Sequence, residues 1–371
     1  LNEQVEFDTT GTAYFLNIQT QLWRSTTKGQ SWTVLPQVFV PGITSVTLVS
    51  GATAVVCTQD EVASGVNLDF PKLHVDTSAA SPFRNTLYVT VDALVKIPHG
   101  ACGSRQFFTH STNGGFSWAR PQEMVGVRPN PLWNLATDHQ GKLIFPHRAV
   151  DQSCNVLITT STNQGVTWTP DRCVYHNQNP GGDPAVGAVE QSIYSYAIDA
   201  NNPASMYVLF SSTYQWAADY SCRPLACVEQ HLWIIRSTDG GLTFSTPIKI
   251  DDGPFGVQVR RGTRYLLSTS STGRLDAVWT DLRHSATPAS GYSGDVYYAS
   301  SADYGVTWST NLRLSSVTRP IDRAGGNQAG DYVALISDGL TAYAAWDSSD
   351  GSGSNQKMMF SKITHGTVPV V

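Results

Sequence analysis

STDGGLTF, residues 237–244, is one of five related stretches in this chain. The others are STTKGQSW at 25–32, STNGGFSW at 111–118, STNQGVTW at 161–168 and SADYGVTW at 301–308. They share Ser, any residue, Asp or Asn, any residue, Gly, any residue, Ser or Thr, and an aromatic residue; the first copy has Thr27 at the third position. Repetition at intervals of tens of residues predicts an architecture of stacked units.

Each residue type that recurs in this pattern has a physical reason to be there. An Asp or Asn side chain can accept hydrogen bonds from backbone amides that follow it, which makes a tight turn. Glycine supplies the positive φ that a β-carbon disfavours. The large aromatic residue needs burial, most simply between neighbouring sheets. We therefore interpret the stretches as structural turns whose aromatic residues are buried, namely Trp32, Trp118, Trp168, Phe244 and Trp308.

The sequence around each turn predicts short β-strands. A β-branched and aromatic run precedes each turn, for example NVLITT at 155–160 and HLWIIR at 231–236, with further runs upstream and a short one after it. Four turn-linked strands per unit are typical of a propeller blade. A last unit without the turn follows in 330–363. We predict six blades, with the first residues completing the ring against the last blade. Seven is the alternative, because 37–69 fits no blade cleanly.

The five stretches resemble the Asp-box (bacterial neuraminidase) repeats of the sialidase superfamily, and the resemblance extends to residue 362. It implies an all-β, six-bladed β-propeller of four-stranded antiparallel blades, forming a single domain over 1–371. One feature of the family is missing. The Phe/Tyr-Arg-Ile-Pro motif that the family carries near its start does not occur. The most similar stretch, FPHR at 145–148, lies in the third unit.

Composition narrows the setting and the partners. The formal charge is −5 and there is no basic run, which disfavours nucleic acid and anionic membranes as partners. No apolar stretch approaches the roughly 18–20 residues that span a bilayer, so we expect no membrane insertion. The chain starts at Leu1 without a secretion signal, which we interpret as a mature or trimmed extracellular protein. A glycan or polysaccharide is the expected partner.

Six cysteines favour disulfides in such a protein. Cys154 opens the strand before one repeated turn and Cys173 lies in the strand after it, so an antiparallel hairpin brings them together. Cys222 and Cys227 share one loop, which leaves Cys57 with Cys102. Buried free thiols are the alternative. The spacings show no metal-binding pattern, and we expect neither a metal site nor a cofactor.

Candidate site residues lie where second strands end and where units begin, at the face opposite the repeated turns. The nine candidates are Arg148, Glu190, Arg264, Tyr265, Asp281, Arg283, Asp331, Tyr332 and Asp347. The segment WTDLRH at 279–284 favours Asp281 as acid/base, with Arg283 on the same face. The family resemblance implies Glu190 as base and Tyr265 as nucleophile. The other residues are assigned to substrate binding, because arginine clamps carboxylates.

Three functions fit this pattern. The first is a secreted, sialidase-like glycoside hydrolase that uses these carboxylates. The second is a non-catalytic propeller that binds glycan or protein at an extracellular surface or in an assembly. The third is a polysaccharide lyase, which needs a base beside a neutralising arginine. His147 with Arg148, or His284 with Arg283, provides that pair.

Overall fold

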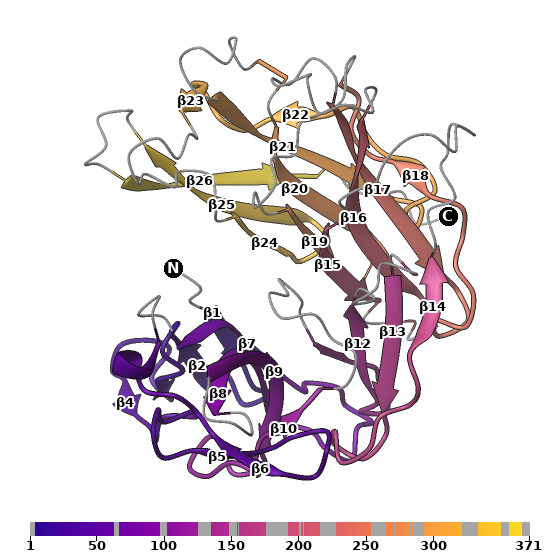
Figure 1. Ribbon diagram of the computed structural model, residues 1–371. Helices are drawn as coiled ribbons and strands as arrows, with labels where there is room; N and C mark the ends of the chain where they lie inside the picture. Colours follow the sequence, from indigo (N-terminus) through magenta and orange to yellow (C-terminus); the bar gives the residue numbers. More distant parts are fainter. Residues whose placement is uncertain are drawn as a thin grey trace. The chain divides into compact units, whose positions relative to one another are not determined.

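A computed structural model describes most of the chain (Figure 1). The described residues are 4–62, 67–96, 102–124, 135–147, 154, 156–175, 192–199, 202, 204–215, 228–253, 265–270, 272–281, 283–284, 293–320, 333–349 and 356–365. They belong to two compact units, residues 1–176 and 177–371. The prediction of a single domain stays a prediction.

The first unit holds three sheets (Figure 1). The first sheet contains β1 (Gln4–Phe7), β2 (Ala13–Leu16), β3 (Leu22–Ser25) and β4 (Thr33–Val34). The second contains β7 (Leu68–Val75), β8 (Leu87–Lys96), β9 (Cys102–Ser111) and β10 (Gln122–Glu123), to which a further hairpin is added. The third contains β11 (Ala136–Thr137), β12 (Leu143–His147), β13 (Val156–Ser161) and β14 (Arg172–Tyr175).

The second unit also holds three sheets (Figure 1). The fourth sheet contains β15 (Ser192–Ile198), β16 (Met206–Gln215), β17 (Val228–Ser237) and β18 (Ile248–Lys249). The fifth contains β19 (Tyr265–Thr269), β20 (Leu275–Asp281), β21 (Ser293–Ser301) and β22 (Leu312–Arg313), and β23 (Arg319–Pro320) pairs with β21. The sixth contains β24 (Val333–Ser337), β25 (Thr341–Ser349) and β26 (Gln356–Thr364). The six sheets are the blades of a β-propeller, as predicted.

The stretch 37–69 is not a seventh blade. It holds the hairpin of β5 (Ser45–Thr47) and β6 (Thr53–Val55), which joins the second sheet where β5 pairs in parallel with β10. It also holds η1 (Gln59–Glu61), the one helical element among the described residues, which is a single 3₁₀ turn. The first described residues, Gln4–Phe7, pair with β2 inside the first sheet, so the prediction that the first residues complete the last blade is wrong for this segment.

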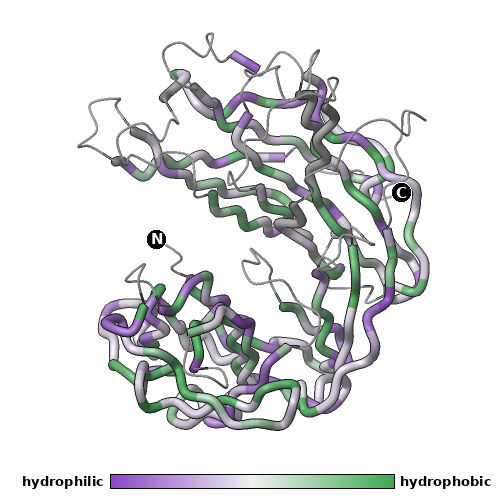
Figure 2. The backbone as a smooth tube through the Cα atoms, viewed as in Figure 1, coloured by the Kyte–Doolittle hydropathy of each residue, from purple (hydrophilic) through white to green (hydrophobic). Residues whose placement is uncertain are grey.

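Hydrophobic packing follows from the strand pattern, and Figure 2 shows apolar residues recurring along the strands of both units. The two middle strands of a blade have neighbouring strands on both sides, so they are more enclosed than the edge strands. All five residues of β12 and all seven of β20 are buried. Polar residues at the ends of these strands therefore lie in an enclosed environment, where they need hydrogen-bond partners.

The five repeated turns share one set of hydrogen bonds. In 237–244, Gly241 N donates to Ser237 Oγ at 2.9 Å, Ser237 Oγ donates to Asp239 Oδ1 at 2.7 Å, and Thr243 N donates to the same Oδ1 at 2.9 Å. The turns at 111–118, 161–168 and 301–308 repeat these bonds. In 25–32 the Thr27 hydroxyl replaces the carboxylate and accepts from Ser31 N at 2.9 Å.

The prediction that all five aromatic residues of the turns are buried is wrong. Trp32 is 41% exposed, and the other four are only partly buried. Trp118 and Trp168 do pack against buried residues, but each keeps part of its ring exposed. Trp32 is the most exposed of the five, and its Nε1 donates to Gly29 O of its own turn at 3.1 Å. The buried members are the serine of every turn and the glycine of the last four turns.

Replacing Trp168 by Ala should lower the free energy of unfolding by roughly 1–3 kcal/mol, less than the full cost of emptying a core aromatic site. The Trp168 ring meets Phe108 of the second sheet edge-on, with centroids 5.4 Å apart, so the loss includes one aromatic pair. Trp32→Ala serves as the control and should cost less, because Trp32 is more exposed. Equal losses in denaturant unfolding of the two variants would contradict this ranking.

Candidate functional site

Strand register places the repeated turn and the candidate residue Asp281 at opposite ends of the fifth sheet. In the fifth sheet, Leu275 at the start of β20 pairs with Ser301, the first residue of the turn. Asp281 at the end of β20 pairs with Asp295 near the start of β21. The third and fourth sheets begin their second strands beside a turn in the same way, with Leu143 opposite Ser161 and Met206 opposite Ser237.

Four of the nine candidates are described: Tyr265, Asp281, Arg283 and Asp347. All four lie in the second unit, in or directly after strands of the fifth and sixth sheets. The other five lie outside the described residues, so their roles stay predictions: Arg148, Glu190, Arg264, Asp331 and Tyr332.

Asp281 is enclosed and fully hydrogen-bonded. It is 0% exposed, and Trp279 Nε1 donates to its Oδ2 at 3.1 Å. Arg283 supplies three more donors: Nε at 2.9 Å and Nη2 at 2.6 Å to Oδ2, and the backbone N at 2.8 Å to Oδ1. Asp281 presents no surface to a substrate in this conformation. The geometry suits it to orienting Arg283, and an acid/base role for Asp281 stays a prediction.

Arg283 connects the fourth and fifth sheets. Its Nη1 donates to Asp252 Oδ1, just beyond β18, at 2.7 Å, and its Nη2 donates to Asn311 Oδ1 at 3.0 Å. Its guanidinium carbon lies 4.0 Å from the centre of the Tyr297 ring. Burial lowers the pKa of Arg283, but the hydrogen bonds and charge of Asp281, followed by the hydrogen bond to Asp252, raise it above its usual value. Arg283 is therefore a permanently charged group held between two carboxylates.

Tyr265 and Asp347 are also enclosed, at 0% and 8% exposure. Tyr265 is the first residue of β19 and pairs with Trp279, which pairs in turn with Tyr297. The Trp279 and Tyr297 rings stack with centroids 6.3 Å apart. This aromatic row crosses the fifth sheet from β19 to β21, and the Arg283 side chain covers its Tyr297 end.

A second cluster lies beside Arg283, centred on His284, which the sequence predicts to act only in the lyase alternative. His284, whose side chain is 50% exposed, has its Nδ1 2.9 Å from Asp295 Oδ2. The Tyr297 hydroxyl lies 3.3 Å from the same Nδ1. Burial raises the pKa of Tyr297, and the nearby charge of Arg283 opposes that rise.

Asp295 was not among the predicted site residues. It is 1% exposed and its carboxylate is surrounded by donors. Arg313 Nη2 and Ser315 Oγ donate to Oδ1 at 2.7 and 2.9 Å, and Thr318 Oγ1 donates to Oδ2 at 3.2 Å. In the sequence Asp295 stands within a strand-forming run, GDVYY, so its only signal was a charged residue in an otherwise apolar strand.

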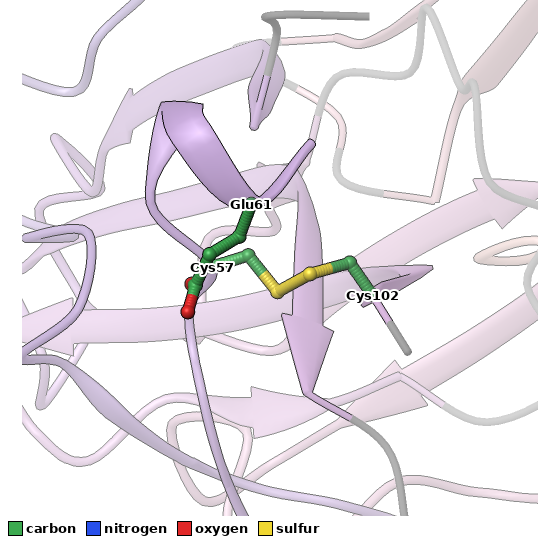
Figure 3. Close-up of side chains that lie close together, drawn as sticks. All are labelled: Cys57, Glu61 and Cys102. Atoms are coloured by element: carbon green, nitrogen blue, oxygen red, sulfur yellow. A yellow bond between two sulfur atoms is a disulfide. The ribbon is translucent and has the colours of Figure 1, made fainter. Parts of the chain in front are cut away.

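Two of the three predicted disulfides are confirmed, Cys57–Cys102 and Cys154–Cys173. Cys222 and Cys227 lie outside the described residues, and peptide mapping without reduction would test their pairing. The first disulfide also accounts for the one group of potential metal ligands among the described residues, Cys57, Glu61 and Cys102 (Figure 3). Both sulfurs are in the S–S bond, so neither is a thiolate ligand, and Glu61 pairs with Lys96. The described part of the chain contains no helix that is long and apolar enough to cross a membrane.

Comparison with known proteins shows the fold. The chain matches no family model and no curated protein sequence. Among solved structures, it is similar to a protein of unknown function from Dyadobacter fermentans, with a TM-score of 0.54 at 13% identity over 97% of this chain and 93% of that one. It is also similar to an α-L-arabinanase from Penicillium chrysogenum, complexed with arabinobiose, with a TM-score of 0.54 at 13% identity over 98% of this chain and 92% of that one. For the intramolecular trans-sialidase from Ruminococcus gnavus the TM-score is 0.50 at 12% identity, over 98% of this chain and 94% of that one. The sialidase-like propeller fold is thus supported at low sequence identity.

Proposed function

We propose that this protein is an extracellular glycoside hydrolase with a sialidase-like propeller fold, acting on a glycan. The observation that carries the proposal is the gathering of charged and aromatic side chains at one end of the fifth sheet, opposite the repeated turn. The fold likeness to an arabinanase and a trans-sialidase supports the substrate class. The two disulfides support an oxidising, extracellular location.

Within this proposal each candidate is given one role. Tyr265 is the nucleophile and Glu190 its base, by analogy with the family. Asp281 fixes the position and charge of Arg283, and the acid/base action that the sequence predicts for Asp281 is still to be tested. The residues proposed to bind the glycan are Arg148, Arg264, Arg283, Asp331, Tyr332 and Asp347.

One observation favours the second candidate function, a non-catalytic glycan- or protein-binding propeller. Tyr265 and Asp281, two of the three predicted catalytic residues, are each 0% exposed. A hydrolase must bring such groups into contact with its substrate, whereas a binding protein needs only the polar surface around them. The two functions differ in one observable, because only the hydrolase releases product.

Tyr265→Phe tests the hydrolase directly. On any glycan that the parent cleaves, the variant should lose at least about a hundredfold in kcat, since the group that bonds to or exchanges a proton with the substrate is gone. Tyr304→Phe is the matched control, because Tyr304 is 49% exposed in a repeated turn. Full activity of Tyr265→Phe would remove Tyr265 from the catalytic set. Binding of a glycan by the parent without any product would favour the second function.

A further inference from the structure

The hydrogen bond between His284 and Asp295 fixes which ring nitrogen carries the proton. Asp295 Oδ2 is a buried acceptor 2.9 Å from His284 Nδ1, so Nδ1 must present a hydrogen to it. In the neutral imidazole this leaves a lone pair on Nε2. The His284 side chain is 50% exposed, and no hydrogen bond among the described residues occupies Nε2. His284 thus presents an oriented base at the surface.

The carboxylate behind this base is held rigidly. Asp295 is 1% exposed and accepts hydrogen bonds from Arg313, Ser315 and Thr318 as well as facing His284. These partners come from the segment that follows β21, which returns to pair with it through β23. A carboxylate with this many fixed partners keeps the imidazole in one tautomer and one orientation, as a catalytic base requires.

A cation stands beside the base. Arg313 uses Nη2 for Asp295 and Thr318, at 2.7 and 2.9 Å, and its side chain is 36% exposed. Its Nη1 and Nε make no hydrogen bond within the described residues, so they can donate to an anion from solvent. Arg283 does not share this property, because its guanidinium is held between Asp281 and Asp252.

We propose that His284, Asp295 and Arg313 form a catalytic site for acidic sugars, in which His284 is the general base and Arg313 binds the carboxylate of a uronic acid. Asp295 is the positioning residue. This inference rests on the proposal that the substrate is a glycan. It assigns a separate reaction, β-elimination, to residues of β21, of β22 and of the segment that follows β20.

The reaction balances without water or any other co-reactant. His284 Nε2 removes the proton from the carbon next to the sugar carboxylate, whose negative charge is met by Arg313. The electron pair left on that carbon forms a double bond to the neighbouring carbon, and the bond from that neighbour to the glycosidic oxygen breaks. The leaving oxygen takes the proton back from the imidazolium. One product is an unsaturated uronate and the other is a shortened chain.

The experiment incubates the purified full chain with polygalacturonate and alginate, and with neutral arabinan and xylan of similar length. Unsaturated uronate is followed by its ultraviolet absorbance, and new reducing ends are counted separately. The parent should form unsaturated product only from the acidic polymers. His284→Ala should lose at least about a hundredfold in kcat, the usual lower bound for an acid–base group, and added imidazole should restore part of it. Arg313→Gln should mainly raise KM, while Arg120→Gln, an exposed arginine elsewhere, should leave both constants unchanged.

Four results would overturn the inference. Unsaturated product that persists at the parent's rate in His284→Ala would exclude this base. Reducing ends without unsaturated product would reject elimination and leave the hydrolase proposal standing. No product of either kind from any of the four polymers would reject elimination, and the proposed hydrolase would then be judged on other glycans. If His284→Ala melts well below the parent, it is assayed beside Arg120→Gln at a temperature where both variants are folded. Failure of added imidazole to restore its activity there would count against His284.

Discussion

Asp281→Ala should lower the free energy of unfolding by roughly 3–5 kcal/mol, the range for removing one partner of a buried ion pair. Asp281 is 0% exposed and holds Arg283 through two guanidinium contacts at 2.6 and 2.9 Å. Without it, Arg283 stays charged in a largely buried place, its side chain 12% exposed, with only Asp252 to balance it. Denaturant unfolding followed by tryptophan fluorescence measures the loss.

Asp60→Ala is the matched control for this prediction. Asp60 is an exposed aspartate in η1, and its removal should change the free energy of unfolding by no more than about 0.5 kcal/mol. A similar small change for Asp281→Ala would show that the pair with Arg283 contributes little. The expected loss of stability also means that inactivity of an Asp281 variant is not by itself proof of catalysis.

Gly165→Ala should lower the free energy of unfolding by roughly 2–5 kcal/mol, through strain and overpacking together. Gly165 has φ +81°, which an L-residue with a β-carbon disfavours, and an added Cβ would lie 2.1 Å from Phe108 Cε1 of the neighbouring sheet. Phe108 is itself buried, so it has little room to move. The turn would have to retract from the sheet that it packs against.

Gly51→Ala separates the two causes. Gly51 has φ +79° but nothing within 4 Å of an added Cβ, so it should show only the conformational cost of about 1–2 kcal/mol. Thermal or denaturant unfolding of the two variants gives the difference that belongs to packing. Equal losses would mean that Phe108 relaxes without cost and that the close approach of turn and sheet is unimportant for stability.

The fold could be predicted because its signals are local. The hydrogen bonds that define the repeated turn lie within its eight residues, as in the Ser237, Asp239 and Gly241 set. Strand alternation and turn spacing then define the blades. The burial of the turn's aromatic residue failed as a prediction because it depends on what lies beside the turn. Trp32 and Trp168 occupy equivalent positions, yet Trp168 packs edge-on against Phe108 of the neighbouring second sheet, whereas Trp32 meets Phe15 of its own sheet and is more exposed.

The site could be predicted only in part, because its partners are far apart in the chain. The pairing of Asp281 with Arg283 follows from a separation of two residues and was anticipated. The bonds of Arg283 to Asp252 and Asn311, which lie 31 and 28 residues away, were not. Asp295 likewise meets His284 and Arg313 only because the strand pairing brings three segments together. No local pattern in the sequence encodes such contacts.

The most direct test of the proposed function is a screen of the purified full chain against acidic and neutral glycans in water enriched in oxygen-18, read by mass spectrometry. Hydrolysis adds one water across the broken bond, so a hydrolase must place the heavy oxygen in one product. We predict a glycan product that carries the label and that forms at a greatly reduced rate with Tyr265→Phe. The absence of any labelled product, with every glycan recovered intact or merely bound, would contradict the account.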